Sequence, residues 1–282
     1  MILFKTVKDI KIFLGKRDKG TSKMAFVPTM GALHGGHISL INNAKNDNFF
    51  TVCSIFVNPT QFNNQLDFSK YPATIENDIY LLEKSGCDVL FLPSAEEIYP
   101  NGPATSVKYD LGYLETILEG KYRPGHFQGV CQVVQRLLEI VQPKMLYLGQ
   151  KDYQQCMVIS KLIDIMGVDI QLNICPTQRE ITGLAMSSRN IRLTDTERTQ
   201  ALRIYETLEL IKRECKPGNL LALKAIATEN LSTNGFVVDY VEIADAKTLE
   251  LKENWDGASP LVALIAAYLN EVRLIDNLVI TN

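Results

Sequence analysis

The strongest constraint on the fold is an alternation of short apolar runs with longer amphipathic segments over the first two-thirds of the chain. The strand candidates are MAFVP (24–28), FFTVCSIFV (49–57), DVLFLP (88–93), KMLYLG (144–149) and VDIQLNIC (168–175). Helical patterns lie between most of them, at 37–46, 74–86, 129–142 and 152–167. Continuous apolar strands that alternate with helices are typical of a parallel sheet covered on both faces. The pattern predicts an α/β fold with a Rossmann-like parallel sheet flanked by helices.

The pattern changes near Thr177. Two helical stretches (194–215 and 220–235) precede the strand-like run 236–245, and the chain ends with apolar strands around a turn that contains Asn270. We therefore expect two domains, 1–177 and 178–282, the second a smaller α+β domain that closes over the site.

The charge balance excludes some classes of partner. The 282 residues include 29 Lys plus Arg and 32 Asp plus Glu, a formal net charge of -3. Such a balance argues against nucleic acid as the main partner, and local basic residues are better explained by a small anionic ligand. No apolar run approaches the roughly 20 residues that a membrane helix needs.

The six cysteines are scattered, without a CxxC pair, and most lie in apolar runs. This distribution favours buried, reduced thiols. The first 20 residues are interrupted by charge, unlike a signal peptide. We expect a cytoplasmic protein that binds no membrane.

Two of the three histidines lie in the turn VPTMGALHGGH (27–37), directly after the first strand candidate. If a helix begins near Gly35, His34 and His37 lie in its first turn, where backbone N–H groups favour anions. Gly31, Gly35 and Gly36 would let a phosphate approach the backbone. Zinc is disfavoured because the spacing is not that of HExxH and no Cys or carboxylate is near. The alternative is a turn whose glycines serve geometry only.

Two further polar motifs also follow strand candidates, where parallel sheets bind ligands. In VNPTQF (57–62), Asn58 and Gln61 are neutral hydrogen-bonding side chains suited to hydroxyls and a carboxylate. In GQKDYQQ (149–155), Lys151 offers a charge for phosphate and Asp152 an acceptor for a ribose hydroxyl, with Gln155 beyond them. The alternatives are an ordinary NP turn and, for Asp152, a helix cap.

Two loops complete the set of candidates. GLAMSSRN (183–190) places Ser187, Ser188 and Arg189 together as a phosphate-binding group, or else as a polar linker between domains. LEGKYRPGHF (118–127), with Glu119, Arg123 and His126, is either a mobile loop over the site or a surface excursion.

Taken together and in this order, these segments resemble the pantoate–β-alanine ligase family over about residues 24–192. VDYVEIAD and RLIDNLVI extend the resemblance more loosely toward the end of the chain. The HxGH and MSSR elements are similar to the HIGH and KMSKS motifs of the class I nucleotidyltransferase superfamily, to which that family belongs.

The resemblance implies a two-step ligation in an ATP- and pantoate-binding first domain. Pantoate attacks the α-phosphorus of Mg·ATP to give pantoyl adenylate and pyrophosphate, and the amine of β-alanine then displaces AMP. It also implies a homodimer. The sequence fits this chemistry, since no nucleophile triad is apparent and catalysis would rest on positioning and charge stabilisation.

The resemblance also implies a role for each matching residue. His37 acts as the general acid toward pyrophosphate, with His34, Lys151 and Arg189 as its catalytic companions. Gln61, Gln155 and Asn58 bind pantoate and β-alanine. Asp78, Glu119 and Arg123 are accessory. The ATP-binding positions are Met30, Gly31, Ala32, Leu33, His34, Gly35, Gly36, His37, Gly149, Gln150, Lys151, Asp152, Gln178, Met186, Ser187, Ser188 and Arg189.

One departure concerns the metal. Asn77 stands beside Asp78 where the family often has an acidic residue, so we assign Mg²⁺ to the nucleotide phosphates and to no dedicated protein site. Two other functions stay open at this point, namely a nucleotidyltransferase that releases its adenylated product and a nucleotide-binding regulator. The extra domain and the glutamines Gln61 and Gln155 favour the ligase.

Overall fold

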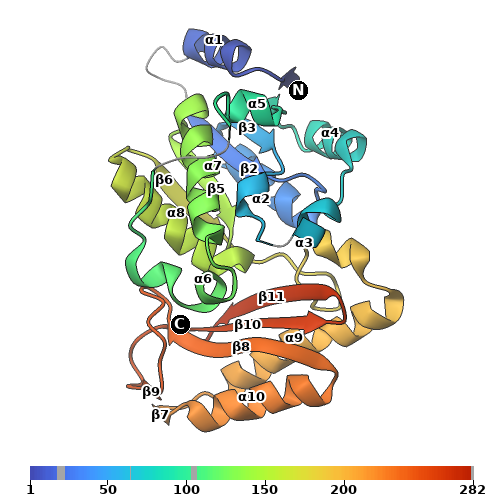
Figure 1. Ribbon diagram of the computed structural model, residues 1–282, viewed down its shortest axis with the longest axis vertical. Coiled ribbons are helices and arrows are strands. Elements are labelled where there is room, and N and C mark those ends of the chain that lie inside the picture. Colours follow the sequence, from blue (N-terminus) through green and yellow to red (C-terminus); the bar gives the residue numbers. More distant parts are fainter. Residues whose placement is uncertain (18–22, 64, 103–106, 281–282) are drawn as a thin grey trace. The chain divides into compact units, whose positions relative to one another are not determined.

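The computed structural model describes residues 1–17, 23–63, 65–102 and 107–280 (Figure 1). The chain divides into two compact units. Unit 1 holds Met1–Gln150 and Gln154–Pro176, and unit 2 holds Lys151–Tyr153 and Thr177–Asn282. The short segment Lys151–Tyr153 therefore belongs with unit 2, although it interrupts unit 1 in the sequence.

Unit 1 contains a sheet of six strands, paired in parallel in the order β1-β4-β3-β2-β5-β6. The strands are β1 (Ile2–Phe4), β2 (Met24–Thr29), β3 (Phe50–Ile55), β4 (Val89–Phe91), β5 (Met145–Gly149) and β6 (Gln171–Cys175). The longer helices of this part of the chain are α1 (Val7–Arg17), α2 (Gly35–Asn46), α4 (Ile75–Lys84), α7 (His126–Val141) and α8 (Tyr153–Met166). The predicted parallel sheet flanked by helices is confirmed.

Both faces of this sheet are covered by helices. Phe26 and Leu146 pack into a core shared with α1, α7 and α8, whereas the residues that follow them, Val27 and Tyr147, pack into a core shared with α2 and α4. Successive side chains of a strand point to opposite faces, so a strand buried on both faces needs apolar residues throughout. This burial is the reason that the strands are continuous apolar runs in the sequence.

The sequence analysis missed β1 and α1. The strand is three residues long, lies at the sheet edge beside β4, and leaves Ile2 and Leu3 exposed. The helix buries only Ile10 and Leu14, among charged neighbours. The strand is too short to show periodicity, whereas α1 places Val7, Ile10, Phe13 and Leu14 at helical spacing against the core, a pattern that we interpreted only as unlike a signal peptide.

Pro28 ends one ladder of the central strand. β2 pairs with β3 as far as Thr29, but with β5 only as far as Phe26. The carbonyl of Met24 accepts from the N–H of Lys144, next to β5, so the even-numbered positions of β2 direct their backbone groups toward β5. Pro28 is the next even position after Phe26 and has no N–H to donate, so the β2–β5 ladder ends there.

Unit 2 is built on an antiparallel sheet in the order β11-β10-β8. Its elements are α9 (Asp195–Glu214), α10 (Leu221–Thr233), β8 (Phe236–Asp245), β10 (Leu261–Leu269), β11 (Val272–Val279) and the short pair β7 (Gly218–Asn219) and β9 (Asn254–Trp255). Both helices share a core with the three-stranded sheet. The predicted turn between the last two strands contains Asn270, with a positive φ of 49°.

Helix α9 begins and ends with the residues expected of a stable helix. Thr194 accepts from the N–H of Glu197, and the Glu197 carboxylate accepts from the N–H of Thr194 in return. This capping box satisfies two donors at the start of the helix. The basic Lys212 and Arg213 in its last turn interact favourably with the negative end of the helix dipole.

The remaining elements are short: α3 (Gln65–Ser69), α5 (Ala95–Ile98), α6 (Leu118–Tyr122), and the 3-10 turns η1 (Pro59–Gln61), η2 (Gly112–Glu115), η3 (Gln150–Asp152) and η4 (Ser188–Arg192). Within the described ranges, no helix combines the length and apolar character needed to cross a bilayer.

Candidate active site

The order of the strands in unit 1 marks where a ligand can bind. From β2 the chain builds the sheet to one side through β3 and β4, and later to the other side through β5 and β6. Open parallel sheets bind ligands beyond the carboxyl ends of their strands at such a switch point. The turn that follows β2 is Met30–His34, and the first residue after β5 is Gln150. Both predicted nucleotide motifs thus begin at this edge.

The two histidines of the HxGH turn cap helix α2. His34 is the N-cap, and its Nδ1 accepts from the N–H of Gly36 at 3.1 Å. The Nδ1 of His37 accepts from the N–H of His34 at 3.3 Å, which completes a reciprocal capping box. A neutral imidazole has one N–H, so a ring that accepts at Nδ1 carries its hydrogen on Nε2. Both rings, whose centroids are 4.1 Å apart, are therefore Nε2–H donors.

The turn before these histidines is held by a buried carboxylate. The two oxygens of Asp78, in α4, accept from the N–H groups of Ala32 and Leu33 at 2.9 and 2.8 Å. The Thr74 hydroxyl donates to the same carboxylate at 2.9 Å. Ala32 has a φ of +49°, a left-handed conformation that alanine adopts at a cost and that these bonds stabilise. Asp78 therefore fixes the approach of the chain to His34.

Gly31 is a position where only glycine fits. Its φ is +85°, and a Cβ there would lie 3.0 Å from the Ile55 side chain and 3.1 Å from Asp78. The backbone geometry of the turn therefore requires glycine at position 31.

Gln61 lies beside the HxGH turn. Its side chain is buried; Nε2 donates to the sulfur of Met30 at 2.9 Å, and Oε1 accepts from Asn58 at 3.3 Å. The His126 Nδ1 lies 2.8 Å from the Gln61 carbonyl oxygen. Side chain and backbone of Gln61 are therefore both fixed by neighbours in unit 1.

Asn58 is almost completely buried, at 1% exposure, and its amide is bonded within the protein. Its nitrogen donates to the Gly129 carbonyl, and its oxygen accepts from the Tyr99 hydroxyl at 2.8 Å. Burial raises the pKa of Tyr99 to about 12, so the phenol stays protonated as a donor. These bonds join the loop after β3 to helix α7 through Gly129 and to the end of α5 (Ala95–Ile98) through Tyr99.

Glycine at position 129 allows that helix to approach. A Cβ on Gly129 would lie 2.4 Å from the Thr60 carbonyl oxygen, far inside contact distance. Only glycine therefore lets α7 pack against η1, the turn that carries Gln61.

The adjacent glutamines 154 and 155 of α8 have different surroundings. Gln154 is buried; its Nε2 donates to the Leu114 and Ile117 carbonyls and its Oε1 accepts from the N–H of Glu119. Gln155 is partly exposed. Gln154 thus holds the chain before α6, where the Glu119 carboxylate lies 3.5 Å from the Arg123 guanidinium.

In unit 2, the MSSR segment follows a tight hairpin. The N–H of Met186 donates to the Gln178 carbonyl and the N–H of Glu180 to the Leu184 carbonyl. Gly183, at the bend, has a φ of +102°, and a Cβ there would lie 2.6 Å from the Tyr205 ring. The hairpin fixes the start of the Ser187–Arg189 turn.

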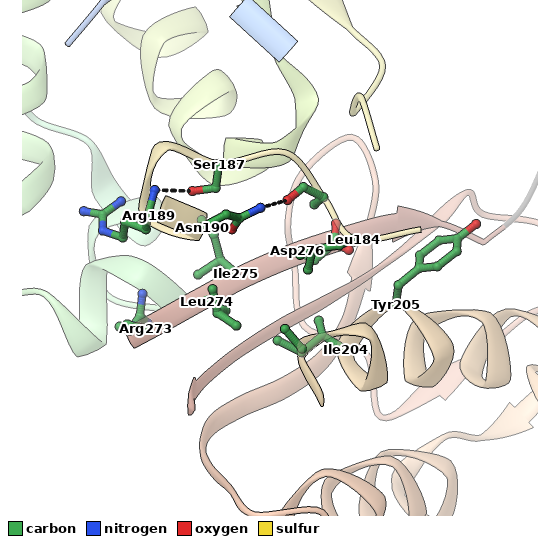
Figure 2. Close-up of a pocket in the computed structure, with 12 residues that line it drawn as sticks. Leu184, Ser187, Arg189, Asn190, Ile204, Tyr205, Arg273, Leu274, Ile275 and Asp276 are labelled. Atoms are coloured by element: carbon green, nitrogen blue, oxygen red, sulfur yellow. Dashed lines mark hydrogen bonds between the residues drawn. The ribbon is translucent and has the colours of Figure 1, made fainter. Parts of the chain in front are cut away.

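The Ser187 side chain then caps that turn. Its Oγ accepts from the N–H of Arg189 at 3.3 Å, and the Asn190 amide donates to the Ala185 carbonyl at 3.0 Å (Figure 2). The Arg189 guanidinium points away from Asp276 and Tyr205 in this view. A pocket lies between the turn, α9 and β11; its lining is Leu184, Ala185, Ser187, Arg189, Asn190, Ala201, Ile204, Tyr205, Arg273, Leu274, Ile275 and Asp276.

An ion pair fixes the hairpin to β11. The two guanidinium nitrogens of Arg179 donate to the two oxygens of Asp276 at 2.6 and 3.0 Å, and the guanidinium also stacks on the Tyr205 ring. Arg179 donates further to the carbonyls of Gly183 and Asn277. Burial raises the pKa of Asp276, and the adjacent Arg179 opposes that shift.

Lys151 is held in the same unit. Its carbonyl accepts from the Asn277 side chain at 2.8 Å, and its ammonium lies 3.8 Å from the Asp152 carboxylate. Tyr153 donates from its hydroxyl to the Ala246 carbonyl at 2.6 Å. The segment after β5 is thus fixed by β11 and by the end of β8.

With this geometry established, comparisons with known proteins identify the family. The pantoate–β-alanine ligase family model matches residues 2–279. The pantothenate synthetase of Cytophaga hutchinsonii is 44% identical over 283 residues, covering 99% of each chain, and that of Bacteroides fragilis is 42% identical over 279 residues, covering 99% of this chain and 98% of that one. The chain belongs to the pantoate–β-alanine ligase family.

Solved structures agree with this membership. The pantothenate synthetase of Thermus thermophilus superposes over the full length of both chains with a TM-score of 0.90 and 37% identity. The pantoate–β-alanine ligase of Francisella tularensis, solved with β,γ-ATP and β-alanine, gives a TM-score of 0.84 and 39% identity over 99% of this chain and 97% of that one. The protein is a ligase that joins pantoate to β-alanine in pantothenate biosynthesis, as the resemblance implied.

Within unit 1, contacts join several of the residues that the pantoate–β-alanine ligase family suggests. Asp78 contacts the turn of His34, and Gln61 contacts both Met30 and Asn58. Within unit 2, Lys151 and the MSSR hairpin both contact β11. Among the residues that the structure describes, no group of three or more His, Cys, Asp and Glu could hold a metal ion.

The sequence analysis assigned no role to the residues that hold this site together. They are Thr74, His126, Gly129, Arg179, Asp276 and Asn277. Two of them carried a signal without a role, His126 in the candidate loop 118–127 and Asp276 in RLIDN, a loose family match. Each of the others contacts a segment that is distant in sequence, except Thr74, one turn before Asp78.

Proposed function

We propose that this ligase works by adenylating pantoate with ATP. A pantoate carboxylate oxygen attacks the α-phosphorus, the bond to the bridging oxygen breaks, and pyrophosphate leaves. The β-alanine amine then attacks the acyl carbonyl, forms the amide and releases AMP. The observation that carries the proposal is the pair of Nε2–H donors at the start of α2, where the helix dipole also favours the triphosphate. The Francisella relative, solved with an ATP derivative and β-alanine, supports it.

The general-acid role expected of His37 takes the form of hydrogen-bond donation in this proposal, because a ring that accepts at Nδ1 is neutral and keeps its Nε2 proton; His34 lies beside it. The Nε2–H of His37 donates toward the bridging oxygen as negative charge develops there. Each preorganised donor aimed at such charge contributes roughly 10²–10³-fold in rate. Capping by Nδ1 fixes both the tautomer and the direction of the donor.

The other ATP contacts are assigned from the family pattern. Lys151, Ser187, Ser188 and Arg189 bind the phosphates, Asp152 the ribose, and the backbone of Gln178 the adenine. Gly149 leaves space for the nucleotide, since no atom outside the adjoining residues lies within 4 Å of a Cβ placed there. The remaining positions, Met30 to Gly36, Gln150 and Met186, line the same nucleotide.

Gln61 and Gln155 bind pantoate, and Gln61 also lines the approach of β-alanine. The bonds of Asn58 to Gly129 and Tyr99 support a different role for Asn58, that of holding Gln61 instead of contacting substrate. Asp78 likewise positions the HxGH turn, since its oxygens accept from backbone N–H groups. Glu119 and Arg123 stay accessory.

Mg²⁺ enters with ATP and is bound by its phosphates. We also propose that unit 1 and unit 2 correspond to the predicted ATP- and pantoate-binding domain and to the smaller domain that closes over the site. A homodimer and a cytoplasmic location complete the proposal; the free cysteines are those of a protein kept in a reducing compartment.

The test separates the two steps. The protein is incubated with MgATP and pantoate, and hydroxylamine, which converts acyl adenylates to hydroxamates, is added in place of β-alanine. We expect pantoyl hydroxamate and stoichiometric pyrophosphate, and with β-alanine instead we expect pantothenate and AMP. AMP formation that needs neither pantoate nor an amine would contradict the proposal. Adenylate that accumulates but never reacts with β-alanine would indicate a simple nucleotidyltransferase, and no pyrophosphate at all would indicate a regulator.

A further inference from the structure

Two neighbouring residues of β11 bond to Lys151 and, through Arg179, to the hairpin that leads into the MSSR turn, the two segments that the proposed function assigns to the phosphates. Asp276 binds Arg179, whose guanidinium also bonds the Gly183 carbonyl in the hairpin before the MSSR turn. Asn277 donates to the Lys151 carbonyl at 2.8 Å. Asp276 and Asn277 are 5% and 2% exposed, so both are buried polar groups whose partners matter.

The alternation of a strand explains how one dipeptide reaches both segments. Leu274 lies in the core shared with α9 and α10, and Asp276, two residues on, points to the same face as Leu274. Asn277 points to the opposite face and contacts Lys151 there. The dipeptide is also bonded internally, since the N–H of Asn277 donates to the Asp276 carboxylate at 2.8 Å.

We infer that Asp276 and Asn277 form a positioning clamp, the β11 clamp, that holds Lys151 and the MSSR turn in one fixed arrangement within unit 2. Lys151 follows β5 of unit 1 in the sequence, yet Lys151–Tyr153 belongs to unit 2. The clamp explains this membership, together with the bond from Tyr153 to Ala246. The backbone of Lys151 and the hairpin before Ser187–Arg189 are therefore both bonded to β11 within unit 2.

This inference rests on the proposed role of Lys151 and the MSSR turn in binding ATP, and it predicts an effect confined to ATP. Asn277→Ala removes the bond to Lys151, and we expect the KM for ATP to rise roughly tenfold, because the loss of a buried hydrogen bond lets the Lys151 segment move away from the phosphates. The KM for pantoate, which the proposal assigns to Gln61 and Gln155, stays within twofold. The control is Thr207→Val in the same unit. It removes a buried hydroxyl that has no hydrogen-bond partner, so the KM for ATP and the KM for pantoate should both stay unchanged.

A double-mutant cycle tests whether Asn277 acts through Lys151. The dissociation constant of ATP is measured for wild type, Asn277→Ala, Lys151→Ala and the double variant. We expect Asn277→Ala to weaken binding less than twofold once Lys151 is already alanine. If the fold-change in the dissociation constant of the double variant equals the product of the two single fold-changes, Asn277 does not act through Lys151 and the inference is overturned. An Asn277→Ala protein whose KM for ATP equals that of wild type would also overturn it.

Asp276→Asn tests the second arm of the clamp. It leaves the Arg179 guanidinium without its carboxylate, and we expect weaker ATP binding again with the KM for pantoate unchanged. Glu242→Gln, which removes the partner of Lys224 elsewhere in unit 2, is the matched control. If Asp276→Asn does not fold, as judged by its melting curve, the Asn277 cycle decides alone. A wild-type protein without pantoate-dependent adenylation would reject the proposed function, whereas an active wild type with a neutral Asn277→Ala would reject only the clamp.

Discussion

His37 carries two duties on one ring, because Nδ1 caps α2 while Nε2 presents the hydrogen. The two duties can be separated by substitution. The side-chain oxygen of asparagine takes the place of Nδ1, whereas the amide nitrogen of glutamine takes the place of Nε2. The geometry thus offers a pair of variants that each keep one duty.

We predict that His37→Asn folds normally but loses adenylation. The cap acceptor is kept, so the melting temperature should stay within a few degrees, while pyrophosphate release slows roughly 10²-fold or more through the lost donor. His37→Gln should keep part of the rate and lose some stability. Single-turnover release of pyrophosphate and a thermal melt measure both. A His37→Asn protein with full adenylation activity would refute the assignment.

Asp78 is predicted to affect both stability and turnover. In Asp78→Asn an amide N–H₂ replaces one acceptor oxygen and faces a backbone N–H of Ala32 or Leu33, so an unsatisfied buried donor should cost about 1–3 kcal/mol. The HxGH turn then shifts, and adenylation slows. Denaturant unfolding and steady-state kinetics measure the two effects.

The control for Asp78 is another carboxylate that accepts a backbone N–H. Asp88, before β4, accepts from the N–H of Thr51 at the amino ends of the strands, away from the turn. Asp88→Asn should therefore reduce stability and leave the kinetic constants unchanged. Equal kinetic effects in the two variants would show that the role of Asp78 is not local.

At the residue scale, the sequence indicates the side chains that can do chemistry better than those that hold them. His34, His37 and Lys151 stand in short motifs whose composition suggests anions. The contact between Asn277 and Lys151 spans 126 positions, and no local pattern encodes it. The role of Asp78 was not predictable for the same reason. The family pattern placed Asp78 near the site, but its bonds to the HxGH turn are seen only in the folded structure.

At the scale of elements, the packing of α7 against η1 governs Gln61. We predict that Gly129→Ala destabilises the protein by about 1–3 kcal/mol, since a Cβ would lie 2.4 Å from the Thr60 carbonyl and the helix must move away. The KM for pantoate should rise with it. Chemical denaturation and pantoate-dependent kinetics provide the measurement.

Gly15→Ala is the matched control. Gly15 lies in α1, and no atom lies within 4 Å of a Cβ placed there. Alanine should stabilise this helix by about 0.5–1 kcal/mol. If Gly129→Ala proved as harmless as Gly15→Ala, the close contact between α7 and η1 would not be needed.

Most helices and strands were predictable from the sequence. The strands are buried on both faces and therefore appear as continuous apolar runs, and amphipathic helical segments lie between them. Strand 236–245 and helix 194–215 were expected within a residue of their observed bounds. The edge strand β1 could not be found, since three half-exposed residues have no periodicity to detect. The strand order was not predictable either. It depends on pairing between segments that are distant in sequence, and local apolar patterns do not encode such pairing.

For the whole molecule, the cysteines give a test of burial. All six are free, and five are buried: Cys53, Cys87, Cys131, Cys156 and Cys175. Burial raises the pKa of Cys87 and of Cys131 to about 12, so these thiols stay protonated at pH 8. We predict that Ellman's reagent modifies at most one thiol of the native protein quickly, that of the partly exposed Cys215, and all six after denaturation.

Cys215→Ser should then abolish the rapid phase and leave the slow phases unchanged. Two or more rapidly reacting thiols in the native protein would show that a buried cysteine is accessible in solution.

The proline in the central strand has a consequence for the engineering of this fold. At Pro28 the central strand β2 lacks a ladder bond to β5, directly before the HxGH turn. Selection for heat resistance alone favours residues that restore such bonds, and natural proteins often give up stability where activity needs it. Variants evolved only for thermostability should therefore accumulate a non-proline residue at this position, extend the pairing of β2 with β5, and lose turnover as they gain in melting temperature.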